Sequence, residues 1–414
     1  MSAPTRLELL MRSIGVDIHK DYAYVFDLGM DGEKKHSKVP LFGDEMAQFL
    51  SSLDQNTQVV VEASTNSARF CEIAASHAGK VVACDPAQAR GVISSTAMND
   101  HKAAEALAKL LQTNFVREVW VPPASVRALR CQVAHHQKLG RMRNQTVNRI
   151  RSLFQQEFIE FTARSLGPRA HKFLQAQFRD QPELRFYLCS LLRSLNQLNS
   201  EIAELELAFG AWSKQSKEAM LLMTIPGIAA VLSVALIAQI GDIRRFPSAD
   251  KLCSYAGLVP RVYESGRVLR HGCISRVGRS AMRWALNIAV WRLSGRSPIL
   301  DGFKQRLQAR RPKRVAWTAA CRKLLAIIWS MLTHNRPFND QDFGLNERKL
   351  ERLETWPEPS ADVFEVPKIK DSRPSARWKL PYSIQAHRDG EGVSQPAKLQ
   401  RGTRPRKRQA SQPD

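Results

Sequence analysis

The sequence is short of acidic residues. Its 414 residues include 39 Asp and Glu against 62 Lys and Arg, a net charge of +23 at pH 7. This deficit argues against an ordinary metabolic enzyme, because so basic a surface binds polyanions. Hydrophobic residues make up 43% of the chain, which excludes a disordered basic protein. We expect two or three domains and a nucleic-acid partner.

Paired cysteines are missing as well. The seven cysteines stand singly, with no C-x-x-C and an odd total: Cys71, Cys84, Cys131, Cys189, Cys253, Cys273 and Cys321. This pattern is typical of reduced thiols in a cytosol and argues against a disulfide frame or a zinc site. We therefore expect a cytoplasmic protein.

A clear membrane segment is also lacking. The first fifteen residues have no apolar run of the kind found in signal peptides. Residues 219–240 are nearly long enough to cross a bilayer, but Pro226 and Gly227 interrupt them. The apolar helix that remains, from Ile228, has about a dozen residues, which is normal for a buried core helix. We expect no membrane association.

The basic charge is unevenly distributed. Residues 1–115 have a net charge of −3, residues 116–345 of +21 and residues 346–414 of +5. The last segment alternates Pro, Ser and charged residues without an apolar period, so we predict a disordered basic tail over 346–414. Its RPRKRQ end either contacts phosphates loosely or is simply solvated.

The first segment predicts an α/β domain over residues 1–120. Three strand-like runs come first, followed by helices that alternate with further strands. In chain order the predicted elements are strands 13–19, 22–29 and 35–42, helix 43–53, strand 58–63, helix 65–77, strand 80–85 and helix 99–111. Three antiparallel strands followed by parallel ones is the order of the ribonuclease-H-like fold.

The middle segment, residues 121–216, predicts a helical coiled-coil domain. Residues 125–161 indicate one or two long helices, and a heptad seam follows at Leu188, Leu191, Leu195, Leu198, Ile202, Leu205 and Phe209. Such a seam packs against another helix, either residues 125–158 folded back or another subunit. We predict a helical hairpin that also dimerises.

The third segment, residues 217–345, predicts a mostly helical domain. Its helices combine one apolar face with many arginines, which suits contact with phosphates. The Pro226-Gly227 turn either presents backbone N–H groups to a phosphate or only ends a helix.

Three acidic residues form a candidate metal site. Asp17 lies inside the apolar run IGVDIH, Glu62 ends the run VVVEA, and Asp100 begins a later helix. A carboxylate at the end of a buried strand costs free energy unless it is paired or binds a metal. The two strands are neighbours in the ribonuclease-H-like order, about 4.8 Å apart. Three oxygens with open water positions are suited to Mg²⁺ and phosphoryl chemistry.

Each acidic residue also has a simpler interpretation. Asp100 fits a helix N-cap, Glu62 a strand-end hydrogen-bond acceptor and Asp17 a turn-facing residue. Their occurrence together, in this order and beside a strongly basic segment, favours the metal site.

The motifs as a set resemble a known family. They are IGVDIHK, VVVEASTN, VVACDPAQAR, MNDHKAAEALAKLL, TIPGIA, RFPSADKLCSYAGLVP, ESG, GCISRVGRSAMRWAL and RKLL. In this order they resemble the transposases of the bacterial insertion-sequence family one-ten and their relatives, the Piv-type DNA invertases. The resemblance covers roughly residues 12–335.

The resemblance implies an architecture and a set of partners. It implies a RuvC-like domain whose Asp-Glu-Asp-Asp set binds one or two Mg²⁺, a coiled-coil connection, and a C-terminal transposase domain over 217–345. It further implies a serine nucleophile that attacks a DNA phosphate, DNA partners at element ends and target, a structured guide RNA, dimers assembled into tetramers, and the bacterial cytoplasm.

The family pattern transfers residue by residue with one departure. Asp17, Glu62 and Asp100 match the first three acids, and Ser265 matches the nucleophile. The fourth acid is expected three residues after the third, where this chain has Ala103, on the helix face that Asp100 shares. We predict nucleic-acid contacts from nearby arginines that neutralise a reacting phosphate, namely Arg267, Arg270, Arg276, Arg279 and Arg283.

The sequence thus predicts a transposase or DNA recombinase that forms a serine-phosphodiester link. Ala103 in place of the fourth acid leaves open whether its catalytic activity is impaired. The alternatives are a non-catalytic DNA- or RNA-binding protein of the same fold, a site-specific DNA invertase, or a junction nuclease that uses only the acidic site.

Overall fold

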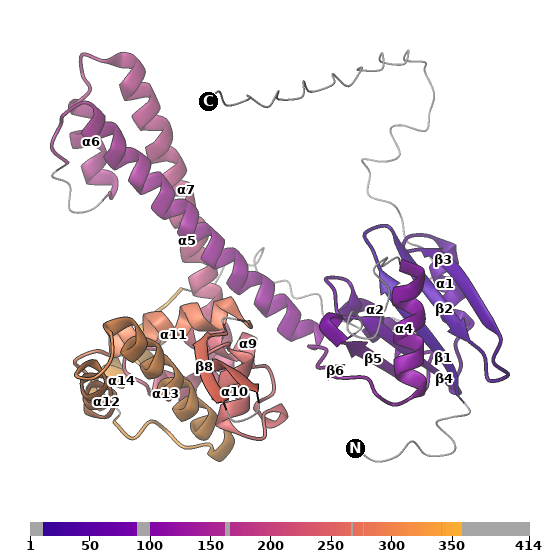
Figure 1. The fold of residues 1–414 in the computed structure, drawn as a ribbon. Coiled ribbons are helices and arrows are strands. Elements are labelled where there is room, and N and C mark those ends of the chain that lie inside the picture. Colours follow the sequence, from indigo (N-terminus) through magenta and orange to yellow (C-terminus); the bar gives the residue numbers. More distant parts are fainter. Residues whose placement is uncertain are drawn as a thin grey trace, which may run out of the picture. The chain divides into compact units, whose positions relative to one another are not determined.

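The computed structural model describes residues 11–88, 100–161, 166–265, 268–275, 277–340 and 342–357. The side chains of residues 168, 169 and 262–271 lie outside this description. Within it, the chain forms an N-terminal mixed sheet, a pair of long helices and a C-terminal helical region with a small hairpin (Figure 1).

A six-stranded sheet organises the N-terminal part, in the order β3-β2-β1-β4-β5-β6. The strands are β1 (Arg12–Ile18), β2 (Tyr22–Leu28), β3 (Lys34–Pro40), β4 (Thr57–Glu62), β5 (Lys80–Cys84) and β6 (Glu118–Val119). The first three strands pair antiparallel, and β4 and β5 are parallel to β1, as the sequence predicted. Two-residue β6, antiparallel to β5 at the edge, was not predicted.

Helices cover both faces of this sheet. Odd and even residues of a strand point to opposite faces, so Ile14 and Val16 pack in one cluster with residues of α1 (Asp44–Ser51) and α2 (Ser67–Ala74). The opposite face is covered by α4 (Asp100–Gln112), whose Leu107 packs on Val60. Gly15 and Asp17 therefore face α4.

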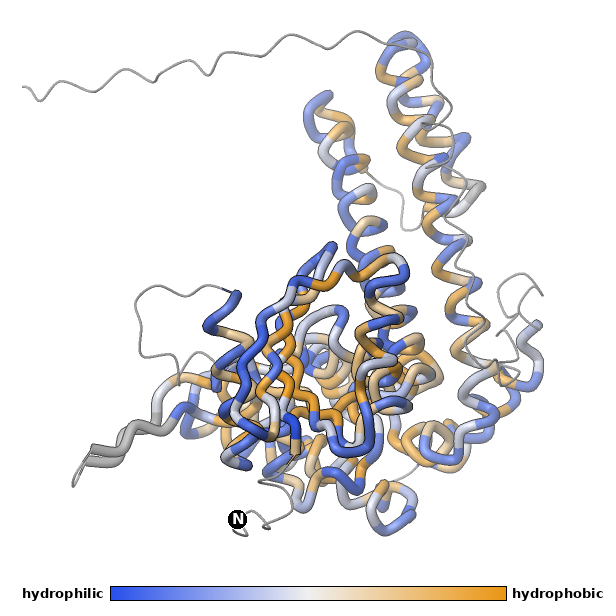
Figure 2. Tube along the Cα trace, turned by 90° about the vertical axis from the view of Figure 1, so that its right-hand side faces the viewer, coloured by the Kyte–Doolittle hydropathy of each residue, from blue (hydrophilic) through white to orange (hydrophobic). Residues whose placement is uncertain are grey.

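Two long helices follow. Helix α5 (Ala124–Gln156) is a single helix and packs against α7 (Pro182–Gln215), with α6 (Pro168–Ala176) between them in the chain (Figure 1). The end of α5 meets the start of α7, since Phe154 and Leu188 share a cluster. The heptad seam of α7 packs against α5 of the same chain, as predicted. Five of its seven residues are buried, and Leu198 and Leu205 are half-buried. Figure 2 shows apolar and polar residues alternating along these helices.

The C-terminal part has one large apolar core. It is built mainly from α9 (Ala230–Ile240), α11 (Ser280–Leu293) and α13 (Lys313–His334), joined by residues of α5 and α7. This part also contains α8 (Lys217–Met223), the 3₁₀ helix η2 (Ile243–Arg245), α10 (Ala249–Tyr255) and α12 (Pro298–Gln308). The 11-residue α9 is the buried core helix that the sequence predicted.

Two features of the C-terminal part differ from the predictions. Strands β7 (Pro260–Ser265) and β8 (Val268–Ile274) form an antiparallel hairpin that the sequence analysis missed. The prediction of a tail from residue 346 was wrong at its start, because α14 (Phe343–Glu354) extends to residue 354. Asp342 caps this helix by accepting from the Leu345 backbone N–H, and Leu353 is buried. The rest of the predicted tail lies outside the described residues.

Among the described residues, one helix, α13, is long and apolar enough to cross a membrane. Its Leu324, Leu325 and Ile328 are fully buried in the protein core, which accounts for the apolar composition. All seven cysteines are free thiols, as expected. Burial raises the pKa of Cys71 and Cys253 to about 11 and that of Cys321 to about 12, which disfavours their reactive thiolate forms.

Candidate functional site

An acidic cluster forms where β1 ends and α4 begins. Asp17 lies on β1 and faces α4, and Asp100 is the first residue of that helix. Val16 pairs with Val61 in the parallel register, so Asp17 and Glu62 occupy the next matching positions on neighbouring strands. The structure therefore brings Asp17 and Asp100 together and places Glu62 on the adjoining strand.

His19 completes the cluster and was not predicted. Its Nε2 atom lies 3.3 Å from Asp17 Oδ2 and 3.2 Å from Asp100 Oδ2. This nitrogen is buried, and the two carboxylates are its contacts. Tyr22 donates its hydroxyl hydrogen to Asp100 Oδ2 at 3.1 Å and stacks on the His19 ring. Only the histidine in IGVDIH, two residues after Asp17, signals this ligand in the sequence.

The donor set fits a divalent cation. Ligand atoms of Asp17, His19 and Asp100 all lie within 4.8 Å of one another. The pKa of Asp17 is raised above its ordinary value, mainly by burial and also by the like charge of Asp100. The contact with His19 opposes this increase. A cation bound here would offset the burial and the repulsion of the two carboxylates, and would accept the lone pair of His19 Nε2.

Ala103 stands where the family resemblance implied a fourth acid. It lies one turn along α4 from Asp100, and its side chain is buried. No oxygen donor therefore comes from this position, and His19 is the additional donor that the described residues offer in the cluster.

Ser265 is the last residue of β7, and its backbone pairs with Val268 of β8. Its side chain lies outside the described residues, as does that of Arg270. Arg267 and Arg276 also fall outside the description. The structure nevertheless places the Ser265 backbone at the end of a paired strand, where the sequence alone indicated only a Ser-Gly turn.

The two described arginines of the predicted set contact the end of α10. Arg279 Nε donates to the Tyr255 hydroxyl at 2.9 Å, and Arg283 Nη1 donates to the Ala256 carbonyl at 2.9 Å. Burial alone would raise the pKa of Tyr255, but the guanidiniums of Arg130, Arg279 and Arg245 outweigh it and lower that pKa. Both arginines thus help to hold α11 against α10.

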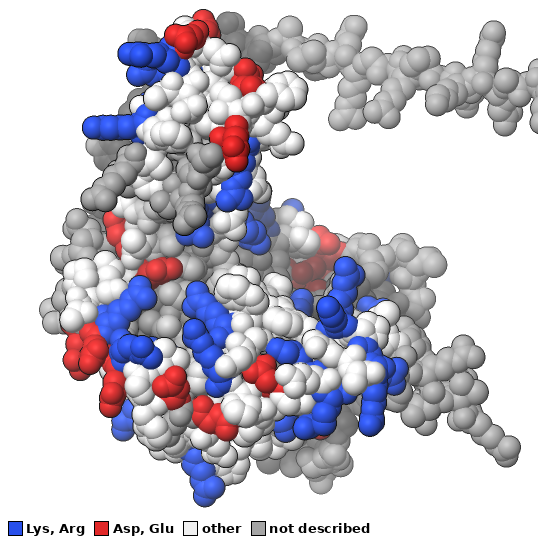
Figure 3. Space-filling model, turned by 90° about the vertical axis from the view of Figure 1, so that its left-hand side faces the viewer, with Lys and Arg blue, Asp and Glu red and all other residues white. Residues whose placement is uncertain are grey.

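Basic side chains are abundant on the surface of this part of the chain. Figure 3 shows Lys and Arg side chains in several groups on one face of the molecule, with Asp and Glu side chains between them. Such a surface attracts nucleic-acid phosphates.

Comparison with known proteins identifies relatives of both halves of the chain. A DEDD-type IS110 transposase model matches residues 14–159, and the model "Transposase IS116/IS110/IS902 family" matches residues 219–305. The first includes Asp17, Glu62 and Asp100, and the second includes Ser265.

Several curated proteins are similar over part of their length. The pilin gene-inverting protein of Moraxella bovis is 35% identical over 149 residues, covering 35% of this chain and 45% of that protein. A probable family 20 transposase of Pseudomonas aeruginosa is 26% identical over 243 residues, which cover 57% of this chain and 72% of that transposase. The transposase for insertion sequence element IS1111A of Coxiella burnetii is 26% identical over 255 residues, which cover 58% of this chain and 67% of that transposase.

The inverting protein is thus matched over less than half its length, whereas the two transposases are matched over about two thirds or more. The two family models match separate segments in the order that the sequence motifs indicated. The chain therefore belongs to the IS116/IS110/IS902 family of transposases.

Proposed function

We propose that the protein is a transposase of a bacterial insertion sequence, which cuts and rejoins DNA through a serine-phosphodiester intermediate. The acidic cluster at the end of β1 is the observation that carries this proposal. Two carboxylates and a buried imidazole nitrogen gather within 4.8 Å, inside the segment matched by the DEDD-type model. Either a proton on His19 Nε2 or a bound cation would satisfy the two carboxylates, and the metal titration described below distinguishes the two.

Asp17, His19 and Asp100 would hold one or two Mg²⁺ ions, and Glu62 is a further ligand from the adjoining strand. Mg²⁺ supplies charge neutralisation at a phosphate and lowers the pKa of a bound hydroxyl or water. Tyr22, by its hydrogen bond to Asp100, orients that carboxylate.

In the proposed reaction the Ser265 hydroxyl oxygen attacks a DNA phosphorus. A serine–phosphate ester forms while one phosphate–sugar ester bond breaks. The serine proton passes to a base, and the departing sugar oxygen takes up a proton. The arginines that follow Ser265 in the sequence would stabilise the negative charge of the phosphorane as it forms. They are Arg267, Arg270, Arg276, Arg279 and Arg283. Attack by a sugar hydroxyl on this ester would rejoin the strands.

Several finer assignments belong to the same proposal. The strand order β3-β2-β1-β4-β5, with the acids at the ends of β1 and β4, supports a RuvC-like, ribonuclease-H-like domain. The basic charge of residues 116–345 supports binding of DNA at element ends and target together with a structured guide RNA. We place the protein in the bacterial cytoplasm as a dimer or tetramer, with the α5–α7 pair as a coiled coil.

The second candidate is a non-catalytic DNA- or RNA-binding protein of the same fold. Ala103 favours it, because the family pattern places an acid at this position. Gain of strand cleavage in Ala103→Asp would assign the lost acid as the cause of any inactivity, and binding without cleavage in both proteins would support this second candidate.

The metal site is tested by calorimetric titration of the protein with Mg²⁺ and with Mn²⁺. We expect Asp17→Asn and Asp100→Asn each to weaken binding at least tenfold, since each removes a charged ligand. The exposed Asp44→Asn serves as the matched control and should bind like wild type. Equal affinity in all four proteins would contradict the site.

A further inference from the structure

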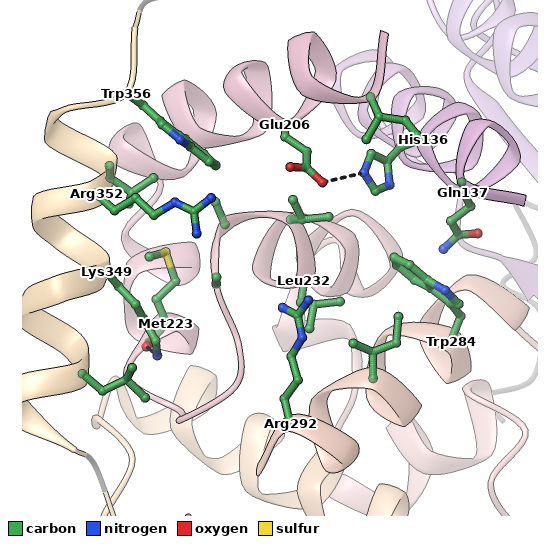
Figure 4. Close-up of a pocket in the computed structure, with 18 of the residues that line it drawn as sticks. His136, Gln137, Glu206, Met223, Leu232, Trp284, Arg292, Lys349, Arg352 and Trp356 are labelled. Atoms are coloured by element: carbon green, nitrogen blue, oxygen red, sulfur yellow. Dashed lines mark hydrogen bonds and ion pairs between the residues drawn. The ribbon is translucent and has the colours of Figure 1, made fainter. Parts of the chain in front are cut away.

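A basic cavity of about 870 Å³ lies where α5, α7, α9, α11 and α14 meet (Figure 4). It is separate from the residues assigned to cleavage, since none of them lines it. Two acidic residues line it, Glu206 and Asp342, against Lys349 and six arginines: Arg141, Arg143, Arg292, Arg296, Arg348 and Arg352. The cavity is therefore strongly positive.

The arginines of this cavity are available to a ligand. In the part of the chain that the structure describes, none of the six forms an ion pair with a carboxylate. Arg348 Nε donates to the Gly344 carbonyl, and the Arg352 guanidinium lies over the Trp356 ring. All six are exposed, and Figure 4 shows Arg292 and Arg352 extending into the hollow. Seven cations against two carboxylates leave an excess of positive charge, so an anion that enters is favoured.

One side of the cavity has a different chemistry. Trp284 of α11 is half-buried, with its ring 6.5 Å from that of His136. Nearby Gln137 has a buried side-chain Nε2 that lacks a hydrogen-bond partner among the described residues. Glu206 lies 3.3 Å from His136 Nε2, and that contact lowers the pKa of Glu206, with further help from Arg352 and Arg143. An aromatic face, a free donor and an ionised acceptor thus adjoin the cations (Figure 4).

We propose that this cavity binds one nucleotide of a single-stranded nucleic acid. The base stacks on Trp284 and meets Gln137 and Glu206 at its edge, and the flanking phosphates lie against Arg292 and Arg352. The cavity volume is in the range of sites that enclose small organic groups. Duplex bases are stacked inside the helix, so an unpaired nucleotide is required. This binding does not involve Ser265 or the acidic cluster.

Fluorescence anisotropy with labelled single-stranded RNA and DNA of one sequence, about ten nucleotides long, tests the proposal. We expect Trp284→Ala and Arg292→Gln each to weaken binding about tenfold. The controls are Trp291→Ala and Arg314→Gln, which remove exposed side chains outside the cavity and should change affinity less than about twofold. Trp284→Phe keeps a stacking ring and should retain most of the affinity, and thermal unfolding checks that every variant folds.

Tighter binding of RNA than of DNA would indicate a contact with the 2′-hydroxyl group. Equal binding of the two would indicate that the protein recognises only base and phosphate. Either result supports the proposal. It is overturned if Trp284→Ala binds like wild type or if Trp291→Ala loses as much affinity. A duplex or a free mononucleotide that binds as tightly as the single strand would also overturn it. Strand cleavage is not read in this experiment, so failure of the serine mechanism leaves its outcome unchanged.

Discussion

At the scale of single residues, the acidic cluster depends on Gly15. This residue lies two positions before Asp17 on the same face of β1, where α4 crosses the sheet. A Cβ atom at Gly15 would lie 2.0 Å from the Ala104 carbonyl oxygen and 2.7 Å from the Ala108 nitrogen. Both contacts are with backbone, so only glycine allows β1 and α4 to come this close and bring Asp17 and Asp100 together.

We predict that Gly15→Ala destabilises the protein by about 1–3 kcal/mol, since strand and helix must separate. The same separation should weaken Mg²⁺ binding. Urea unfolding and metal titration measure the two effects. Gly302→Ala is the control: its added Cβ meets only the end of the Arg306 side chain at 3.6 Å, and alanine favours the helix. Equal stability of Gly15→Ala and wild type would contradict the close packing.

Lys349 connects α14 to the turn before α9. Its Nζ donates to the carbonyls of Met223 and Ile225 at 2.6 and 2.9 Å. Burial lowers its pKa to about 8, with Asp342 opposing and Arg296 reinforcing the change. The charged form of this amine is therefore disfavoured in the folded protein.

This pKa predicts a pH dependence of stability. The unfolded lysine titrates near 10.4, so between about pH 8 and 10.4 the unfolded chain binds more proton than the folded one. The contribution of Lys349 to the free energy of unfolding should therefore rise over this window and fall as pH drops to 8. The difference in the free energy of unfolding between wild type and Lys349→Met, measured at pH 7, 8, 9 and 10, isolates the contribution of Lys349. A difference that stays constant with pH would argue against the lowered pKa.

At the scale of elements, the α5–α7 pair offers a test within one helix. Leu195 is 1% exposed, whereas Leu198, the next seam position, is only half-buried. We predict that Leu195→Ala costs about 2–5 kcal/mol of stability and that Leu198→Ala costs less than half as much. Urea unfolding of both variants measures this. Equal costs would indicate that Leu198 is covered by another subunit, as in the predicted dimer.

Elements with a strong local pattern were predictable. The alternation in residues 13–29 and the apolar run before Glu62 predicted β1, β2 and β4, because each strand has a buried face that its sequence must supply. The 3-4 spacing along α7 predicted its packing in the same way. Asp17 and Asp100 were brought together by the predicted strand and helix order.

Other elements carry little local signal. The β7–β8 hairpin was missed because charged residues interrupt its alternation and its turn contains a single glycine. Helix α14 was missed because it is polar on most sides and its position depends on Lys349 and Leu353. The role of His19 and the cavity beside Trp284 depend on residues far apart in the chain, which spacing alone does not connect.

At the scale of the whole molecule, charge and chemistry are divided along the chain. The sheet region, with a net charge of −3 over residues 1–115, contains the proposed metal ligands, and residues 116–345, with +21, contain Ser265 and most of the lining of the basic cavity. The proposed function has the second region attract the nucleic acid, and has the serine and the metal site act together on its phosphate. Cleavage should therefore require both regions, whereas binding should require mainly the second.

The most direct test is to look for a covalent protein–DNA adduct. Full-length protein is incubated with DNA from the flanks of its gene, candidate flanking RNA and Mg²⁺, then separated under denaturing conditions. The proposed function predicts an adduct that disappears with Ser265→Ala, with Asp17→Asn and with chelator, and that persists with Ser275→Ala, a serine just beyond β8. Strand cleavage that survives Ser265→Ala without an adduct would contradict the serine mechanism.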